Sequence, residues 1–248
     1  MKYHHEAAKL LPHRLRVSDA AAKAVQQREL ELDITFPAAV REWYSIEGAS
    51  ALLAAYSNDD RPIELSKLGA PFDDWYGGGP RNFVPEGLLL FMCENQGVCN
   101  WAVKLDGTPD PAVVVEVDTA PNADWLPCAE HFSIFTYCQI WDHSSREAGV
   151  AAQETELSPN DLAFLKSHFR ELPTTNRWPG NANYRFENEC GAILIWDGGD
   201  CGADWFAWSR TASGLESLLH SIWHCGELSQ TFYEIEGPAA AILKKLRS

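Results

Sequence analysis

The 248-residue chain lacks the short motifs from which catalytic and cofactor sites are most often inferred. It has no serine in a Gly-x-Ser-x-Gly setting, and its cysteines do not show the Cys-x-x-Cys spacing of a zinc knuckle. Its glycine clusters, at residues 77–79 and 198–199, do not precede a helix with the Lys-Ser/Thr pair of a phosphate-binding loop. We therefore expect a protein that is not an enzyme and that holds no cofactor and no metal ion.

Long apolar runs are also missing. No run approaches the length needed to cross a bilayer, and the start, MKYHHEAAKLL, lacks the continuous apolar core of a signal peptide. The seven cysteines are an odd number, and most lie within apolar strand patterns, as small buried hydrophobes do in a reducing compartment. We expect a cytoplasmic protein with no membrane partner.

Positive charge is scarce. The chain has 20 Lys and Arg against 35 Asp and Glu, a net charge of -15, and residues 33–150 alone hold 18 acids and six basic residues. This balance argues against nucleic acid and anionic membranes as partners and favours a basic protein partner. Solubility alone is the alternative explanation of the acidic charge.

Three apolar runs with turn residues between them lie in the segment from Leu88 to Asp118. The first run ends at the polar turn Glu94-Asn95-Gln96-Gly97, and two further runs follow at 98–105 and 112–117. Alternating runs and turns of this kind predict a three-stranded antiparallel meander.

Helices are predicted on both sides of this meander. Ser18 is a candidate N-cap for a helix over 17–32, Pro37 fits the first turn of a second helix, and Gly48 is placed as the C-terminal cap of that second helix. A short helix near 50–56 and a closing helix within 128–142 complete this part. Residues 144–156 are polar and small, which predicts a linker between a domain at 1–150 and a smaller one at 151–248.

The second half repeats the order of helix, strands and closing helix, which suggests a degenerate second copy of a similar α+β unit. Its predicted elements are a helix over 158–171, strands at 183–187, 192–196 and 205–209, a helix over 215–223 capped by Ser213, a short strand at 232–233 and a helix over 239–246.

One run of features resembles a known family. Leu32-Asp33-Ile34-Thr35-Phe36-Pro37 is followed by a helix with Val40, Trp43 and Tyr44, by Glu47-Gly48, by the meander with Trp101, and by Trp125 and Phe132. Over about residues 17 to 143 this order resembles the SMI1/KNR4, or SUKH, superfamily. The resemblance implies an α+β fold, an antiparallel sheet flanked by helices, without catalytic residues. It also implies a bacterial immunity protein that neutralises a polymorphic toxin, or a regulatory interaction protein as in fungi.

The candidate protein-binding residues combine acids, amides and large aromatics in predicted loops, and residues 73–142 hold 11 acids against two basic residues. Aromatic anchors ringed by charge are typical of tight interfaces between different proteins. The alternatives are that the tryptophans belong to the core and that the amides satisfy their own turn. The predicted contact residues are Asp73, Asp74, Trp75, Tyr76, Glu94, Asn95, Gln96, Asp124 and Trp125.

His220 and His224, four residues apart with Cys225 next, could place two metal ligands on one helix face. The glutamate of an HExxH motif is absent, so ordinary helix-face histidines are the favoured interpretation and a metal protein is the minor alternative. The favoured hypothesis is therefore an immunity protein with a basic toxin domain as its partner. A regulatory or scaffold protein of the same fold with a cellular protein partner is the alternative.

Overall fold

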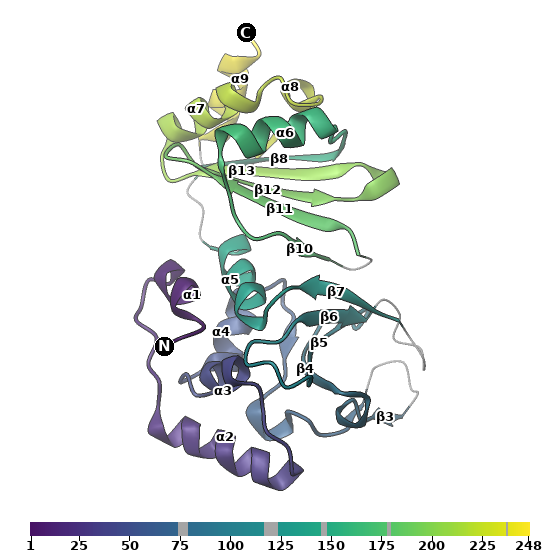
Figure 1. Ribbon diagram of the computed structural model, residues 1–248. Coiled ribbons are helices and arrows are strands. Elements are labelled where there is room, and N and C mark those ends of the chain that lie inside the picture. Colours follow the sequence, from purple (N-terminus) through teal and green to yellow (C-terminus); the bar gives the residue numbers. More distant parts are fainter. Residues whose placement is uncertain (74–78, 117–123, 145–147, 178–179, 237) are drawn as a thin grey trace. The chain divides into compact units, whose positions relative to one another are not determined.

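The computed structural model describes residues 1–73, 79–116, 124–144, 148–177, 180–236 and 238–248 (Figure 1). The chain divides into two compact units, unit 1 with Met1–Ser144 and Asn176–Gly180, and unit 2 with Ser145–Thr175 and Asn181–Ser248. Each unit joins helices to an antiparallel sheet, which confirms the α+β fold class. No helix in the described ranges is both long and apolar enough to cross a bilayer.

Unit 1 begins with helices that follow local capping signals. Ser18 caps the second helix by accepting a hydrogen bond from the Ala21 N–H at 3.4 Å, as predicted. The prediction for Gly48 is wrong, because its φ of 74° turns the chain into the next helix, whereas the preceding helix already ends at Tyr44 with Ser45 as its C-cap. The helices of unit 1 are α1 (His5–Leu10), α2 (Asp19–Leu32), α3 (Ala38–Tyr44), α4 (Ala49–Ala55) and α5 (Phe132–Asp142), with short 3-10 turns η1 (Leu65–Lys67) and η2 (Val84–Glu86).

The predicted meander forms the centre of the unit 1 sheet. Its antiparallel register pairs Leu90 with Ala102 and Val103 with Val113. The closing helix starts only at Phe132, because the preceding residues from Trp125 onward form a further strand that the sequence did not predict. The sheet has the order β1 (Arg61–Pro62), β4 (Leu88–Cys93), β5 (Asn100–Lys104), β6 (Val113–Glu116) and β7 (Trp125–Ala129).

Both faces of this sheet are buried. Leu89 and Phe91 point into the core shared with the helices, whereas Leu88 and Leu90 point into a smaller cluster around Phe83 on the other face. That second face packs against the hairpin of β2 (Phe72–Asp73) and β3 (Pro80–Arg81), since Phe72 contacts the smaller cluster. Burial on both sides explains why the strands are continuous apolar runs rather than alternating ones.

The N-terminal arm is part of the unit 1 core. His4 is fully buried, with Nε2 2.9 Å from the Ala39 carbonyl oxygen and Nδ1 2.9 Å from the Thr136 hydroxyl oxygen. The Glu42 carboxylate accepts hydrogen bonds from the backbone N–H groups of residues 2, 3 and 4. Burial acts to raise the pKa of Glu42, but these three donors outweigh it and leave the pKa below its usual value.

In unit 2 the predicted linker is wrong. Its small residues form most of β8 (Ala148–Thr155), where Val150, Ala151 and Ala152 are fully buried between two neighbouring strands. Small residues are typical of linkers, but they also fit a strand that is covered on all sides. The other strands are β9 (Arg170–Glu171), β10 (Thr175–Asn176), β11 (Ala182–Glu187), β12 (Ala192–Asp197), β13 (Ala203–Ser209) and β14 (Tyr233–Glu236), in the order β10-β11-β12-β13-β8-β14 with β9 beside β11.

The helices of unit 2 gather on one face of this sheet (Figure 1). Ser158 and Asp161 form the capping box of the first helix of unit 2, at 159–168. The next helix, at 212–222, is capped by Thr211 rather than by the predicted Ser213, because it begins earlier than predicted. Each unit has its own central meander of three antiparallel strands. In unit 1 the strand beside the meander, β7, follows it in the chain, whereas in unit 2 the strand beside the meander, β8, precedes it. These helices are α6 (Pro159–His168), α7 (Ala212–Ile222), α8 (Leu228–Thr231) and α9 (Ala239–Leu246), with a short turn η3 (Gly199–Cys201).

Burial of His4 predicts a specific pH dependence of stability. Desolvation lowers the pKa of His4 below 6.5, so the unfolded chain takes up the proton first as the pH falls, and the free energy of unfolding decreases below pH 6.5. We expect His4→Gln to be less stable than the wild type by about 1–3 kcal/mol at pH 7.5, with a smaller difference at pH 5. Urea unfolding at both pH values measures this, and a difference that does not change with pH would contradict it.

Candidate protein-binding surface

The structure brings most of the predicted contact residues to one end of the unit 1 sheet. Cys93 pairs with Asn100 and Glu116 pairs with Trp125, so the β4–β5 turn and the start of β7 are neighbours at the same end. With strands about 4.8 Å apart, Gln96 and Asp124 are separated by roughly 10–15 Å across the sheet. Three predicted residues, Asp74, Trp75 and Tyr76, lie outside the described residues.

A buried ion pair fixes the β2–β3 hairpin to this end. Arg81 on β3 lies 2.5 Å from the Glu116 carboxylate on β6, which is fully buried, and Asn100 on β5 donates to the other carboxylate oxygen at 2.8 Å. The guanidinium also lies over the Phe83 ring, 4.6 Å from its centroid. The pair therefore holds the hairpin, in which Asp73 pairs with Pro80, at the end of the sheet where β6 ends and β7 begins.

This ion pair is not predicted from the sequence. Glu116 ends an apolar strand run, and its partner Arg81 lies 35 residues earlier in a Gly/Pro-rich loop. A charged residue inside a predicted buried strand is itself a signal, since such a group requires a partner of opposite charge. The identity of the partner depends on how the hairpin folds over the sheet, which local sequence does not specify.

Trp125 is partly a core residue. Its ring meets the Phe83 ring edge to face at a centroid distance of 5.8 Å, and it packs against the smaller apolar cluster. The neighbouring Asp124 is exposed, as is Asp73 on the hairpin. The alternative that the tryptophans belong to the core thus holds in part for Trp125, whose remaining surface stays accessible beside two exposed carboxylates.

The β4–β5 turn uses its polar side chains internally. The Glu94 carboxylate accepts hydrogen bonds from the backbone N–H groups of Gln96, at 2.7 Å, and Val98, at 3.3 Å. The Asn95 side chain donates to the Asn58 carbonyl. The Glu94 carboxylate therefore stabilises the turn, whereas the Asn95 amide bonds to the segment before β1 rather than to its own turn, and Gln96 is the exposed member of the three.

The segment before β1 adds acids that the sequence analysis did not select. Asp59 is exposed, and Asp60 is 8% exposed and accepts a hydrogen bond from the Asn95 N–H at 3.2 Å. Burial raises the pKa of Asp60 to about 6, and the nearby Glu94 charge adds to the effect. In the sequence, the run of turn-forming residues at 57–60 was the signal that could have identified this segment. We call Asp59, Asp73, Glu94 and Asp124 the acidic sheet end.

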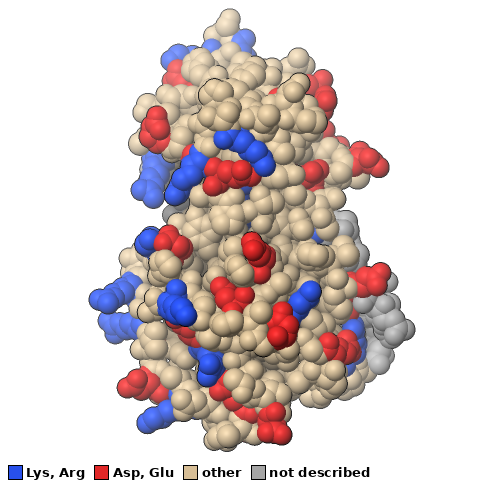
Figure 2. Space-filling view, viewed as in Figure 1, with Lys and Arg blue, Asp and Glu red and all other residues tan. Residues whose placement is uncertain are grey.

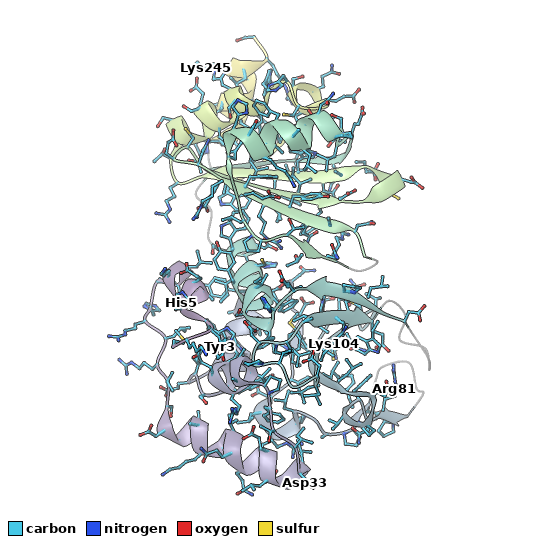
Figure 3. All side chains as sticks on the ribbon, viewed as in Figure 1. Tyr3, His5, Asp33, Arg81, Lys104 and Lys245 are labelled. Atoms are coloured by element: carbon cyan, nitrogen blue, oxygen red, sulfur yellow. The ribbon has the colours of Figure 1, made fainter. Side chains whose placement is uncertain are left out.

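The positive charges near the acidic sheet end are held by other groups. Arg61 donates to the Glu94 carbonyl, and Arg81 is paired with Glu116. Lys104 ends β5 at the opposite end of the sheet, away from Arg81 (Figure 3). In Figure 2 more of the basic side chains of unit 1 lie on the left, but basic and acidic side chains are mixed across the visible face. The acidic sheet end can therefore attract a cationic surface.

The two histidines considered as metal ligands, His220 and His224, contact different side chains. His220 lies 3.9 Å from Glu216, and His224 packs edge-on against the Phe164 ring at 4.5 Å between centroids. Burial raises the pKa of Cys225 to about 12. In the part of the chain that the structure describes, no three His, Cys, Asp or Glu side chains are grouped as metal ligands. None of the seven cysteines, all within that part, forms a disulfide.

Asp60→Asn tests the burial of this carboxyl. The folded state keeps the Asp60 proton up to about pH 6 while the unfolded chain loses it near 3.8, so stability falls as the pH rises through this window. The amide retains an acceptor for the Asn95 N–H and cannot ionise. We expect the variant to match the wild type at pH 3.5 and to exceed it by about 1–2 kcal/mol at pH 7.5 in urea unfolding. An unchanged difference at both pH values would refute this assignment.

Arg81→Met tests the ion pair. The substitution leaves the buried Glu116 carboxylate without its counter-charge, and we expect a loss of about 3 kcal/mol in the free energy of unfolding. The double variant Arg81→Met/Glu116→Gln retains the hydrogen bond to Asn100 without a buried charge, so it should lose less than the single variant. Additive losses in denaturant unfolding would show that the two side chains are not coupled.

Comparison of the chain with models of protein families, with curated proteins and with solved structures finds no match. The resemblance to the SMI1/KNR4 superfamily therefore stays a prediction, which rests on the residues quoted for it.

Proposed function

We propose that the protein is a protein-binding module that neutralises a polymorphic toxin, with the acidic sheet end as the surface that meets a basic toxin domain. The observation that carries this proposal is that exposed Asp59, Asp73 and Asp124 lie at the same end of the unit 1 sheet, spread from the edge strand β1 to the edge strand β7, while Arg81 is paired with the buried Glu116. The SMI1/KNR4 resemblance, with its immunity proteins, supplies the class of partner.

Charge supports a basic partner. Residues 33–150, which form most of unit 1, have 18 acids and six basic residues. Exposed carboxylates at a sheet end raise the local concentration of a cationic protein and accelerate its association at low salt. Toxins that cleave nucleic acids have basic surfaces for the same electrostatic reason. A cluster of carboxylates would therefore compete with the nucleic acid for such a surface.

The internal contacts that hold the acidic sheet end also support a binding role. The turn is held by the Glu94 carboxylate and by Asn95, and the hairpin is held by Arg81 and Glu116. A surface fixed before binding loses less conformational entropy when a partner arrives, which leaves more of the interaction energy for affinity. Trp125 adds a half-buried aromatic of the kind that forms interface anchors.

The experiment uses the product of the adjacent gene, co-expressed with this protein. We expect a complex and rescue of growth, with an association rate that falls as ionic strength rises. Asp73→Asn/Asp124→Asn should lower that rate by roughly tenfold at low salt and weaken its salt dependence. Stopped-flow or biolayer interferometry measurements at several salt concentrations report the association rate and its salt dependence.

The matched control is Glu86→Gln/Glu130→Gln, which removes two exposed carboxylates at the opposite end of the same sheet. This variant should associate nearly as fast as the wild type. Equal effects of the two double variants would reject the acidic sheet end as the contact surface. A neighbour that is neither toxic nor bound would reject the immunity function and favour a regulatory or scaffold role.

A further inference from the structure

The edge strand β14 of the unit 2 sheet lacks the proline found in both edge strands of the unit 1 sheet, although its pairing with β8 contains a register irregularity between Glu234 and Glu236. β1 is two residues long and contains Pro62, and β7 contains Pro127, whose carbonyl accepts from the Asn176 side chain at 3.2 Å. Prolines, short strands and covering segments are the usual means of blocking a sheet edge. β14 has four residues without proline, and no strand of the described ranges pairs with its outer edge.

A shallow, open hollow of about 650 Å³ lies between β14 and α9. Its apolar lining includes Phe232 and Leu243, which are 1% and 3% exposed, and Ala240 on α9. Tyr233 also lines it and is 41% exposed, an unusual state for a large apolar side chain in this structure. Free strand edge and apolar hollow are thus adjacent, as in domains that bind a peptide by adding a strand.

The rim of the hollow is cationic although the chain is acidic. Lys244 is exposed and forms no ion pair among the described residues, and Arg247 donates to the backbone carbonyls of Ser229, Gln230 and Phe232 rather than to a carboxylate. The next residue, Lys245 (Figure 3), pairs instead with Glu216 at 2.5 Å. Arg247 is thus held by backbone carbonyls, and Lys244 is the exposed cation of the lining, beside the acid Glu234. This favours an occupant that carries a carboxylate.

We propose that the outer edge of β14 binds an extended segment of another protein by strand addition. An apolar side chain of that segment lies in the hollow, and a neighbouring carboxylate meets Lys244. Backbone hydrogen bonds to the strand give affinity, and the hollow gives specificity. A second copy of this chain is disfavoured as the occupant, because each copy carries a net charge of -15. This surface is separate from the acidic sheet end.

The test screens a phage-displayed library of random eight-residue peptides for binding to the full-length protein. Selected peptides should alternate β-branched or aromatic residues with polar ones and should include an acid. Ala240→Trp fills the hollow from an exposed helix position, and Lys244→Glu reverses the rim charge. Each should weaken binding of a selected synthetic peptide at least about tenfold, an effect of roughly 1.4 kcal/mol or more.

Lys23→Glu is the matched control, because it makes the same charge change at an exposed helix position in unit 1 and should leave peptide affinity unchanged. Asp73→Asn/Asp124→Asn should also leave it unchanged, which separates this proposal from the proposed function. The proposal is overturned if no peptide is enriched, or if selected peptides bind Ala240→Trp and Lys244→Glu as tightly as the wild type. A concentration-dependent dimer in sedimentation that Ala240→Trp abolishes would overturn it in favour of a second copy.

Discussion

Unit 1 depends on burial of its central meander from both sides. All six residues of β4 are buried, with helices on one face and the β2–β3 hairpin with Phe83 on the other. An antiparallel sheet can leave one face in water, so the second cover needs its own contacts. Here those contacts are the apolar cluster around Phe83 and the Arg81–Glu116 ion pair. Because the sheet is covered on both faces, the Glu116 carboxylate is removed from solvent, and Arg81 compensates its charge.

The same arrangement determines where the candidate surface lies. Because the hairpin is fixed to the end of β6, it brings Asp73 to the side of the sheet where the β4–β5 turn and β7 begin. The acids of the acidic sheet end come from segments far apart in the chain, and the turn between them is held by its own carboxylate. Stability and charge display are therefore linked, since loss of the ion pair would also release a part of the surface.

Local signals predicted much of this fold and little of the site. Apolar runs indicated the meander, and Ser18 marked a helix start, because strand propensity and capping act within a few residues. Gly48 and β8 were misassigned because a left-handed glycine can end or start a helix and small residues suit linkers and covered strands alike. Asp60 and Glu116 acquired their partners only through tertiary contacts, which explains why the sequence analysis passed over them.

The division of the chain into units has a consequence for synthesis on the ribosome. His4 meets Thr136 across 132 residues of sequence, so the N-terminal arm stays without its partner until α5 has emerged. Residues 176–180 also belong to unit 1, although they follow the first strand and helix of unit 2. Domains that fold during translation usually finish in order, N-terminal first. In this chain the first unit cannot be completed before the second has begun to appear.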